Sequence, residues 1–256
     1  MYGTPAVWSR VILVISTSIP TPIPIHVVRR LSRRFPETTR VVCLGVSRER
    51  GCDDESTKYL DALVRLRDTV HDRDILVFMH EHDTSWHHST PQRKRLDALV
   101  TTPYFQASSF GGIFCRHNDH FAPEEFLNTH ARSTVWHSDP QMRGASLWAS
   151  IFRATPMERR FPRAWLYPCC GTFFVSGAAV RSRPASLYAT VSRNLKRECG
   201  SIGTEHSPYR SADRGGVRII GRAMESAWQV LLANRTAVPL PPDCSPPTDI
   251  VKASAV

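Results

Sequence analysis

The sequence predicts a single α/β domain with a largely parallel sheet flanked by helices. Three short apolar runs rich in β-branched residues, at 11–16, 41–46 and 74–80, have the length and composition of buried strands. Between the second and the third run, apolar residues recur at helical spacing over 59–70. Strands that alternate with helices are typical of βαβ units, in which the strands are parallel.

The connections between these strands are expected to be helical. Segment 25–35 follows a proline-rich loop and mixes apolar residues with arginines, which indicates a short basic amphipathic helix. The polar loop at 47–56 runs into the next helix. We expect Asp53 or Asp54 to cap that helix, because a carboxylate there accepts backbone N–H groups and suits the positive end of the helix dipole.

The rest of the chain continues the alternation of helices and strands. Thr90 and Pro91 indicate the start of a helix that reaches Val100, because threonine caps a helix and proline fits its first turn. We expect further helices at 123–130, 145–153, 181–198 and 222–234, and further strands at 112–115 and 171–176. No internal repeat or domain boundary is visible. We therefore predict one catalytic domain over residues 1–237 and an extended proline-rich tail over 238–256.

The chain carries a formal net charge of +10 over 256 residues, which favours an anionic partner such as nucleic acid. Of its 33 lysines and arginines four are lysines, so 29 are arginines, which suit bidentate phosphate contacts. A codon bias toward arginine in a GC-rich genome is the alternative explanation. Clusters of basic residues nevertheless predict a polyanion-binding surface, at 29–34, 93–95, 153–163, 181–197 and 210–222.

The cysteines and the apolar segments indicate a cytoplasmic protein. The seven cysteines include no CxxC pair, and an odd number without that spacing fits reduced thiols better than disulfides or a zinc ribbon. The apolar run at 11–15 is too short to cross a bilayer, and the proline-rich stretch after it is unlike a signal peptide. We therefore expect no membrane partner.

The segment ILVFMHEHDTSWHH at 75–88 holds the densest group of reactive side chains. His80 and His82 lie two residues apart at the end of a predicted strand, so they share one face if the strand continues. With Asp83 they could bind a divalent metal, or they could transfer protons, because histidine titrates near neutral pH. A histidine-rich rim with one structural hydrogen bond is the simplest alternative.

A second group of charged side chains opens the helix after the second strand. Asp53, Asp54 and Glu55 are consecutive, yet one N-cap position needs only one acidic side chain. The surplus could bind a cationic substrate group or act as a base. Ligands of open α/β sheets bind at the carboxyl ends of the strands, so we expect both groups and the loop after Ser176 to converge there. In this arrangement the histidines are expected to move protons rather than hold an ion, and we predict no metal and no cofactor.

Motifs for several other kinds of chemistry are absent from the sequence. There is no Walker A or GxGxxG pattern, so neither ATP nor a dinucleotide is expected. There is also no GxSxG motif. Ser47, Ser176, Cys169 and Cys170 are candidate nucleophiles without a diagnostic context.

Four segments together resemble one protein family. They are GCDDESTKYLDALV at 51–64, VFMHEHDTSWHH at 77–88, CCGTFFVSGAAVRSRPASLYATV at 169–191 and MESAWQVLLAN at 224–234. The chain is similar over about 41–243 to a fungal family known as a domain of unknown function, which includes the arginine-containing cyclodipeptide synthases of ascomycete secondary-metabolite clusters. The segment HEHD departs from the pattern, because many relatives have a less acidic strand end.

The resemblance implies an aminoacyl-tRNA-dependent cyclodipeptide synthase that forms a cyclo(Arg-Xaa) diketopiperazine from arginyl-tRNA and a second aminoacyl-tRNA. Because the aminoacyl ester is already activated, no ATP site is needed. The catalytic residues expected under this reading are Glu55, His80, His82 and Asp54. The expected substrate-binding residues are Asp53, Asp83, Trp86, His87 and Ser176. The expected tRNA-binding residues are Arg29, Arg30, Arg33, Arg34, Arg181, Arg183, Arg193, Lys196 and Arg197.

Two other functions remain compatible with the sequence. The first is a glycosyltransferase-like enzyme of glycosyltransferase-A-like fold, in which HEHD would bind a divalent metal and a nucleotide sugar would be the donor. The second is a non-catalytic RNA-binding protein. The sequence leaves open the second amino acid, a covalent aminoacyl-enzyme and the oligomeric state.

Overall fold

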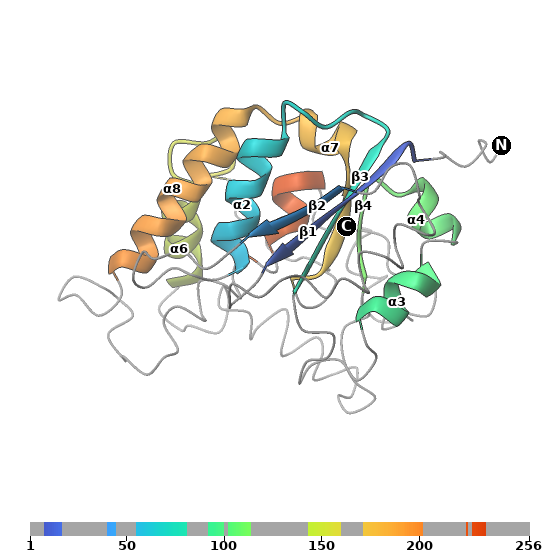
Figure 1. Ribbon diagram of the computed structural model, residues 1–256. Helices are drawn as coiled ribbons and strands as arrows, with labels where there is room; N and C mark the ends of the chain where they lie inside the picture. Colours follow the sequence, from blue (N-terminus) through green and yellow to red (C-terminus); the bar gives the residue numbers. More distant parts are fainter. Residues whose placement is uncertain are drawn as a thin grey trace, which may run out of the picture.

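The computed structural model describes residues 8–16, 40–44, 55–80, 92–99, 102–113, 143–159, 171–201, 224 and 227–233. Within these residues, one five-stranded sheet lies between two groups of helices (Figure 1). The strands are β1 (Arg10–Ser16), β2 (Arg40–Leu44), β3 (Asp74–His80), β4 (Phe110–Gly112) and β5 (Phe173–Ser176). The helices are α2 (Glu55–Leu66), α3 (Gln92–Leu99), α4 (Pro103–Ala107), α6 (Arg143–Ile151), α7 (Gly177–Arg181) and α8 (Ala185–Ser201), with a further helical segment at 224 and 227–233.

Helices cover both faces of the sheet. On one face lie α2, α6, α8 and the helical segment at 227–233, and on the other lie α3 and α4 (Figure 1). Alternate residues of a strand face opposite sides, so Val14 packs under α2 while Leu13 packs under α3 and α4. Because β1 and β3 are buried on both faces, their sequences are continuous apolar runs rather than alternating ones.

The sheet is mixed, which corrects the prediction of a largely parallel sheet. Its strand order is β2-β1-β3-β5-β4. β1 pairs in parallel with β2 and β3, whereas β5 pairs antiparallel with both β3 and β4. The α/β class is correct, but the direction of β5 was not predictable, because an apolar run has the same composition whichever way its strand points.

Most predicted elements are present with shifted ends. The strand predicted at 41–46 is β2, the strand at 112–115 lies two residues earlier as β4, and the helix at 145–153 is α6. The helix predicted at 181–198 begins four residues later as α8, and a separate short helix, α7, precedes it at 177–181. Pro184 explains the break, because proline disfavours the helical conformation at the residue before it. The helices predicted at 25–35 and 123–130 and the proline-rich tail lie outside the described residues.

Helix α4 was not predicted, although its signal is in the sequence. Thr102 caps it, since its side chain accepts a hydrogen bond from the backbone N–H of Phe105, and Pro103 occupies the first turn. The pair Thr102-Pro103 repeats the threonine–proline signal seen at Thr90. The helix is five residues long, which is too short for apolar periodicity to appear.

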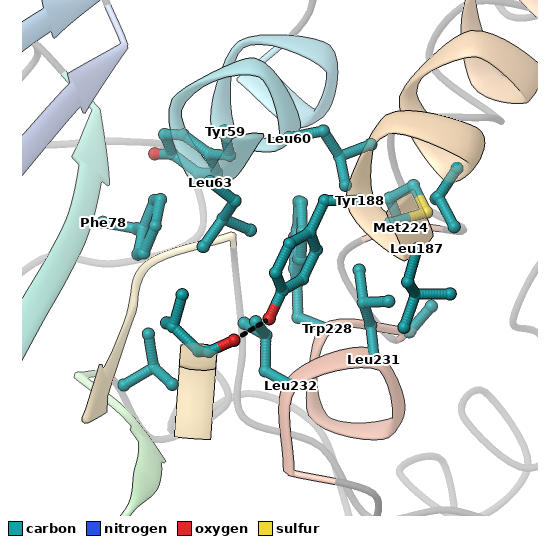
Figure 2. Close-up of a cluster of buried hydrophobic side chains, with 14 of the residues drawn as sticks. Tyr59, Leu60, Leu63, Phe78, Leu187, Tyr188, Met224, Trp228, Leu231 and Leu232 are labelled. Carbon is teal, nitrogen blue, oxygen red and sulfur yellow. Dashed lines mark hydrogen bonds between the residues drawn. The ribbon is translucent and has the colours of Figure 1, made fainter. Parts of the chain in front are cut away.

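Aromatic side chains join α2 to the sheet. The ring of Tyr59 packs against Phe78 of β3 at a centroid distance of 4.9 Å and against Trp228 at 6.0 Å (Figure 2). Tyr188 of α8 lies in the same core, and its hydroxyl donates to the carbonyl of Val180 at 3.0 Å. Burial raises the pKa of the Tyr188 phenol well above its ordinary value, so this side chain remains a neutral hydrogen-bond donor.

Gly177 allows α7 to begin directly after β5. A Cβ atom at this position would collide with the backbone carbonyl of His71, which cannot move without displacing the turn before β3. We expect Gly177→Ala to lower the free energy of unfolding by about 1–3 kcal/mol, as overpacking does. The urea midpoint measures this, with Ala178→Ser on the exposed neighbouring residue as control. Equal midpoints for Gly177→Ala and wild type would contradict the close approach.

Asn194 holds the end of α6. Its buried side-chain amide donates to the carbonyls of Ile151 and Arg153 at 3.0 and 2.9 Å. Asn194→Ala leaves both carbonyls without this donor, so we expect a loss of about 1–3 kcal/mol in the free energy of unfolding. Chemical denaturation measures the loss. Asn194→Asp is the matched variant, and it is expected to be at least as unstable because a carboxylate would face two carbonyl oxygens.

Candidate functional site

The structure brings together two residues that the sequence placed on separate segments. Glu55 is the first residue of α2, and His80 is the last residue of β3. The Nδ1 atom of His80 lies 2.6 Å from Oε2 of Glu55, and the two side chains are 10% and 19% exposed. This carboxylate–imidazole pair is therefore largely shielded, yet it remains reachable from solvent.

Apolar packing one turn away explains why these two side chains meet. Glu55 precedes Tyr59 by four residues on the helix, and His80 follows Phe78 by two residues on the strand. Four helical residues advance about 6 Å and two strand residues about 6.7 Å. Once Tyr59 packs on Phe78, the next contact along both elements is the Glu55–His80 pair.

The pair has the geometry of a base held in one orientation. The carboxylate of Glu55 lies against Nδ1 of His80, so it holds the imidazole ring in one direction and favours a proton on Nδ1. Proton exchange with a substrate would then go through Nε2. The arrangement places an imidazole that can accept a proton at the carboxyl ends of the parallel strands, where α/β sheets bind ligands.

Ser16, the last residue of β1, lies next to this pair and was missed by the sequence reasoning. In the parallel pairing of β1 with β3, Ser16 is the register partner of His80. Its residue is 8% exposed. Its position in the sequence could have indicated it, because Ser16 is the first polar residue after a continuous apolar run. Such a residue ends a strand, as His80 does.

Ser176 and His80 lie at opposite ends of the strands. The prediction that the loop after Ser176 converges with the other two segments is therefore wrong. Because β5 runs antiparallel to β3, Ser176 is paired with Ile75 at the start of β3. It is buried, and its hydroxyl accepts the N–H of Ala179 at 3.2 Å as the N-cap of α7. Its observed contacts are those of a helix cap.

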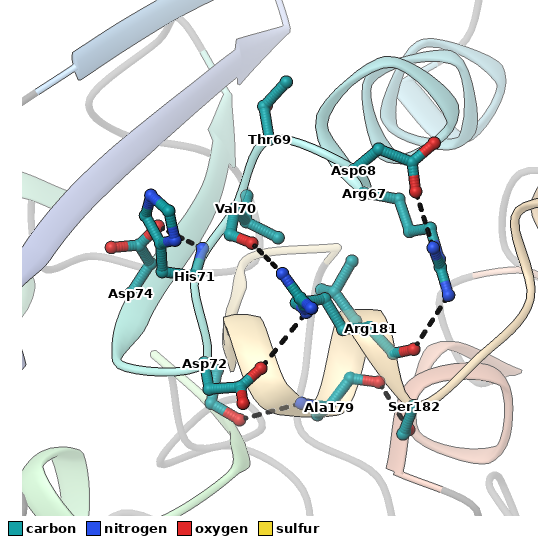
Figure 3. A network of polar contacts seen from close by, with 12 residues as sticks. Arg67, Asp68, Thr69, Val70, His71, Asp72, Asp74, Ala179, Arg181 and Ser182 are labelled. Atoms are coloured by element: carbon teal, nitrogen blue, oxygen red, sulfur yellow. Dashed lines mark hydrogen bonds and ion pairs between the residues drawn. The ribbon is translucent and has the colours of Figure 1, made fainter.

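Two of the basic residues expected to bind tRNA form structural contacts at the end of the strands where Ser176 lies. Arg181 donates to the carbonyl of Val70 and pairs with Asp72 at 3.2 Å (Figure 3). Arg183 donates to the carbonyl of Leu231, so it ties the segment before α8 to the helical segment at 227–233. These contacts join neighbouring elements and lie away from the Glu55–His80 pair.

The remaining described basic candidates lie on α8. Lys196 contacts Asp61 of α2, with Nζ 2.8 and 3.0 Å from the two carboxylate oxygens. Arg193 and Arg197 are exposed, and Arg197 lies 3.7 Å from Glu198. The exposed charge of this helix is thus carried mainly by its two arginines, while Lys196 also joins α8 to α2.

The other predicted site residues lie outside the described residues. They are Asp53, Asp54, His82, Asp83, Trp86, His87, Arg29, Arg30, Arg33 and Arg34. Among the residues that are described, no three histidine, cysteine or acidic side chains are grouped as a metal site would require. No helix in that part of the chain is long and apolar enough to cross a membrane.

The fold and the pair define an α/β protein with a carboxylate-oriented histidine at the carboxyl edge of its parallel strands. Over residues 44–245 the chain matches the family described as "Protein of unknown function (DUF3431)", and it belongs to that family. No curated protein and no solved structure matched the chain.

Proposed function

We propose that this protein is an aminoacyl-tRNA-dependent cyclodipeptide synthase that joins arginine to a second amino acid. The observation that carries the proposal is the contact between Glu55 and His80. Aminolysis of an aminoacyl ester needs a group that removes a proton from the attacking α-ammonium, and a histidine held by a carboxylate is suited to that step. The resemblance of four segments to the arginine-containing cyclodipeptide synthases supports the substrate class, and the net charge of +10 favours a tRNA partner.

In the proposed reaction, His80 accepts a proton from the α-ammonium of one aminoacyl group. The resulting amine attacks the ester carbonyl of the other aminoacyl group, and a second aminolysis within the dipeptide closes the diketopiperazine. Because Glu55 is engaged with His80, we assign it to orienting the imidazole rather than to binding the arginyl side chain. The arginyl guanidinium of the substrate is then assigned to the remaining acidic candidates, Asp53, Asp54 and Asp83, which would bind it through charge-assisted hydrogen bonds.

Product formation from charged tRNA tests the proposal. Purified protein is incubated with arginyl-tRNA and a mixture of other aminoacyl-tRNAs, and cyclo(Arg-Xaa) products are detected by mass spectrometry. We expect products that disappear when RNase is added first. Products that persist after RNase would contradict the tRNA-dependent reaction. Equal binding of charged and uncharged tRNA without any product would indicate an RNA-binding protein instead, and manganese-dependent use of a nucleotide sugar would indicate a glycosyltransferase.

A further inference from the structure

We propose that Ser16 is the nucleophile of this site, acylated by the substrate ester, with His80 as its base and Glu55 as the group that orients His80. The inference rests on the proposed function only for the identity of the acyl donor. It adds a covalent acyl-enzyme to the reaction and assigns its position. The three residues come from β1, β3 and α2, so no local sequence motif connects them.

The strand register puts Ser16 and His80 side by side. Along β1 and β3 the register partners are Val14 with Phe78 and then Ser16 with His80. Val14 and Phe78 both belong to the core beneath α2, and residues two apart on a strand share a face. The Ser16 side chain is therefore on the face that carries the Glu55–His80 pair, on a strand about 4.8 Å from β3.

The described residues around Ser16 give its hydroxyl no hydrogen-bond partner. The residue is 8% exposed, and its side chain makes no hydrogen bond among the described residues. The residue keeps some exposure, so its hydroxyl can be reached by a bound ligand. The five residues before it, 11–15, are apolar and pack in the two cores. A hydroxyl at the carboxyl ends of the strands can act on a bound substrate, whereas an apolar side chain there cannot.

A second buried serine nearby does not compete for this role. Ser56 of α2 follows Glu55, but it is completely buried, and its hydroxyl oxygen has no exposed surface and no hydrogen-bond partner in the described structure. A substrate cannot reach it without unfolding the start of α2. Ser16 keeps some exposure and is the register partner of the imidazole. Ser56 is therefore a suitable matched control.

The chemistry is an acyl transfer in two balanced steps. The Ser16 hydroxyl loses its proton to His80 while its oxygen bonds to the ester carbonyl carbon. The bond from that carbon to the ribose oxygen then breaks, and the ribose oxygen takes the proton from His80. In the second step the α-amine of the other aminoacyl group bonds to the same carbon and loses a proton to His80, the bond to Ser16 breaks, and His80 passes that proton to the Ser16 oxygen.

A fluorophosphonate probe tests the nucleophile without tRNA. An activated serine bonds to phosphorus and releases fluoride, so we expect a stable adduct that peptide mass spectrometry locates on Ser16. Ser16→Ala and His80→Gln should lose the adduct, and Ser56→Ala should keep it. Thermal melts confirm that each variant is folded. A probe adduct at another serine that is unchanged in Ser16→Ala would overturn the proposal.

The second arm uses arginyl-tRNA and separates this proposal from the proposed function. We expect acid-quenched wild-type protein to carry one arginyl group on Ser16, and Ser16→Ala to form product at least about a thousandfold more slowly. Ser16→Cys should carry the arginyl group as a thioester that hydroxylamine cleaves. Normal product formation by Ser16→Ala would overturn the nucleophile and leave the function standing. A probe adduct on Ser16 without any product from charged tRNA would uphold the nucleophile and contradict the function.

Discussion

Replacing His80 with glutamine is expected to lower the rate of product formation from charged tRNA by about 10²- to 10⁴-fold, the range that a general base contributes. Glutamine keeps most of the volume and a polar end, so the packing of Tyr59 on Phe78 should be retained. Glu55→Gln should reduce the rate less severely, because it removes the charge that orients the imidazole but leaves the imidazole in place. Single-turnover rates with arginyl-tRNA measure both effects.

The matched control for this prediction is His71→Gln. His71 is an exposed histidine in the turn before β3, at the opposite edge of the sheet, and its described hydrogen bonds use backbone atoms. It should keep the wild-type rate. A wild-type rate for His80→Gln together with an impaired rate for His71→Gln would contradict the assignment of His80. The reaction would then take place at the other end of the strands.

Replacing Asp74 with alanine is expected to lower the free energy of unfolding by about 3–5 kcal/mol, as the loss of one member of a buried ion pair does. Its side chain is 1% exposed and pairs with Arg10 of β1. The same carboxylate accepts the backbone N–H of His71 at 2.7 Å. Alanine would leave this N–H without its acceptor and the partly buried Arg10 guanidinium without its anionic partner. The predicted loss of stability therefore comes from the contacts that join β1, β3 and the turn that precedes β3.

Urea denaturation with Asp74→Asn beside Asp74→Ala separates charge from hydrogen bonding. Asparagine keeps one acceptor and most of the volume, so we expect it to lose less stability than alanine. Asp68→Ala is the control, because Asp68 pairs with Arg67 at an exposed position where ion pairs contribute little. A midpoint for Asp74→Ala close to that of Asp68→Ala would contradict the structural role of the buried pair.

Two of the three residues of the candidate site were predictable because local patterns mark the ends of elements. His80 ends an apolar run, and Glu55 opens a segment with helical periodicity, so each could be placed at an element boundary from sequence. Their convergence followed from the rule that α/β sheets bind ligands at the carboxyl edge. Ser16 also ends an apolar run, yet its pairing with His80 depends on β1 and β3 being direct neighbours in register. Register is a property of two strands and is absent from either sequence alone.

The wrong inference about Ser176 has the same physical origin. The composition of the segment at 171–176 predicted a central strand, and in the structure this segment pairs with β3. The direction of β5 decides at which end of the sheet Ser176 lies. That direction depends on how the chain enters the sheet. The basic residues show a related limit. Arg181 and Arg183 look like surface charge in sequence, but their guanidinium groups bind backbone carbonyls of segments far away in the chain.

The sequence by itself determined the α/β class, the buried strands, the start of α2 and the family, because these depend on periodicity, capping and composition within short segments. Only the tertiary structure decided that the sheet is mixed, that Glu55 holds His80 and that Ser16 lies beside them. Strand direction and register are set by the packing of the whole core. A site built from three separate elements therefore becomes visible only when that core is assembled.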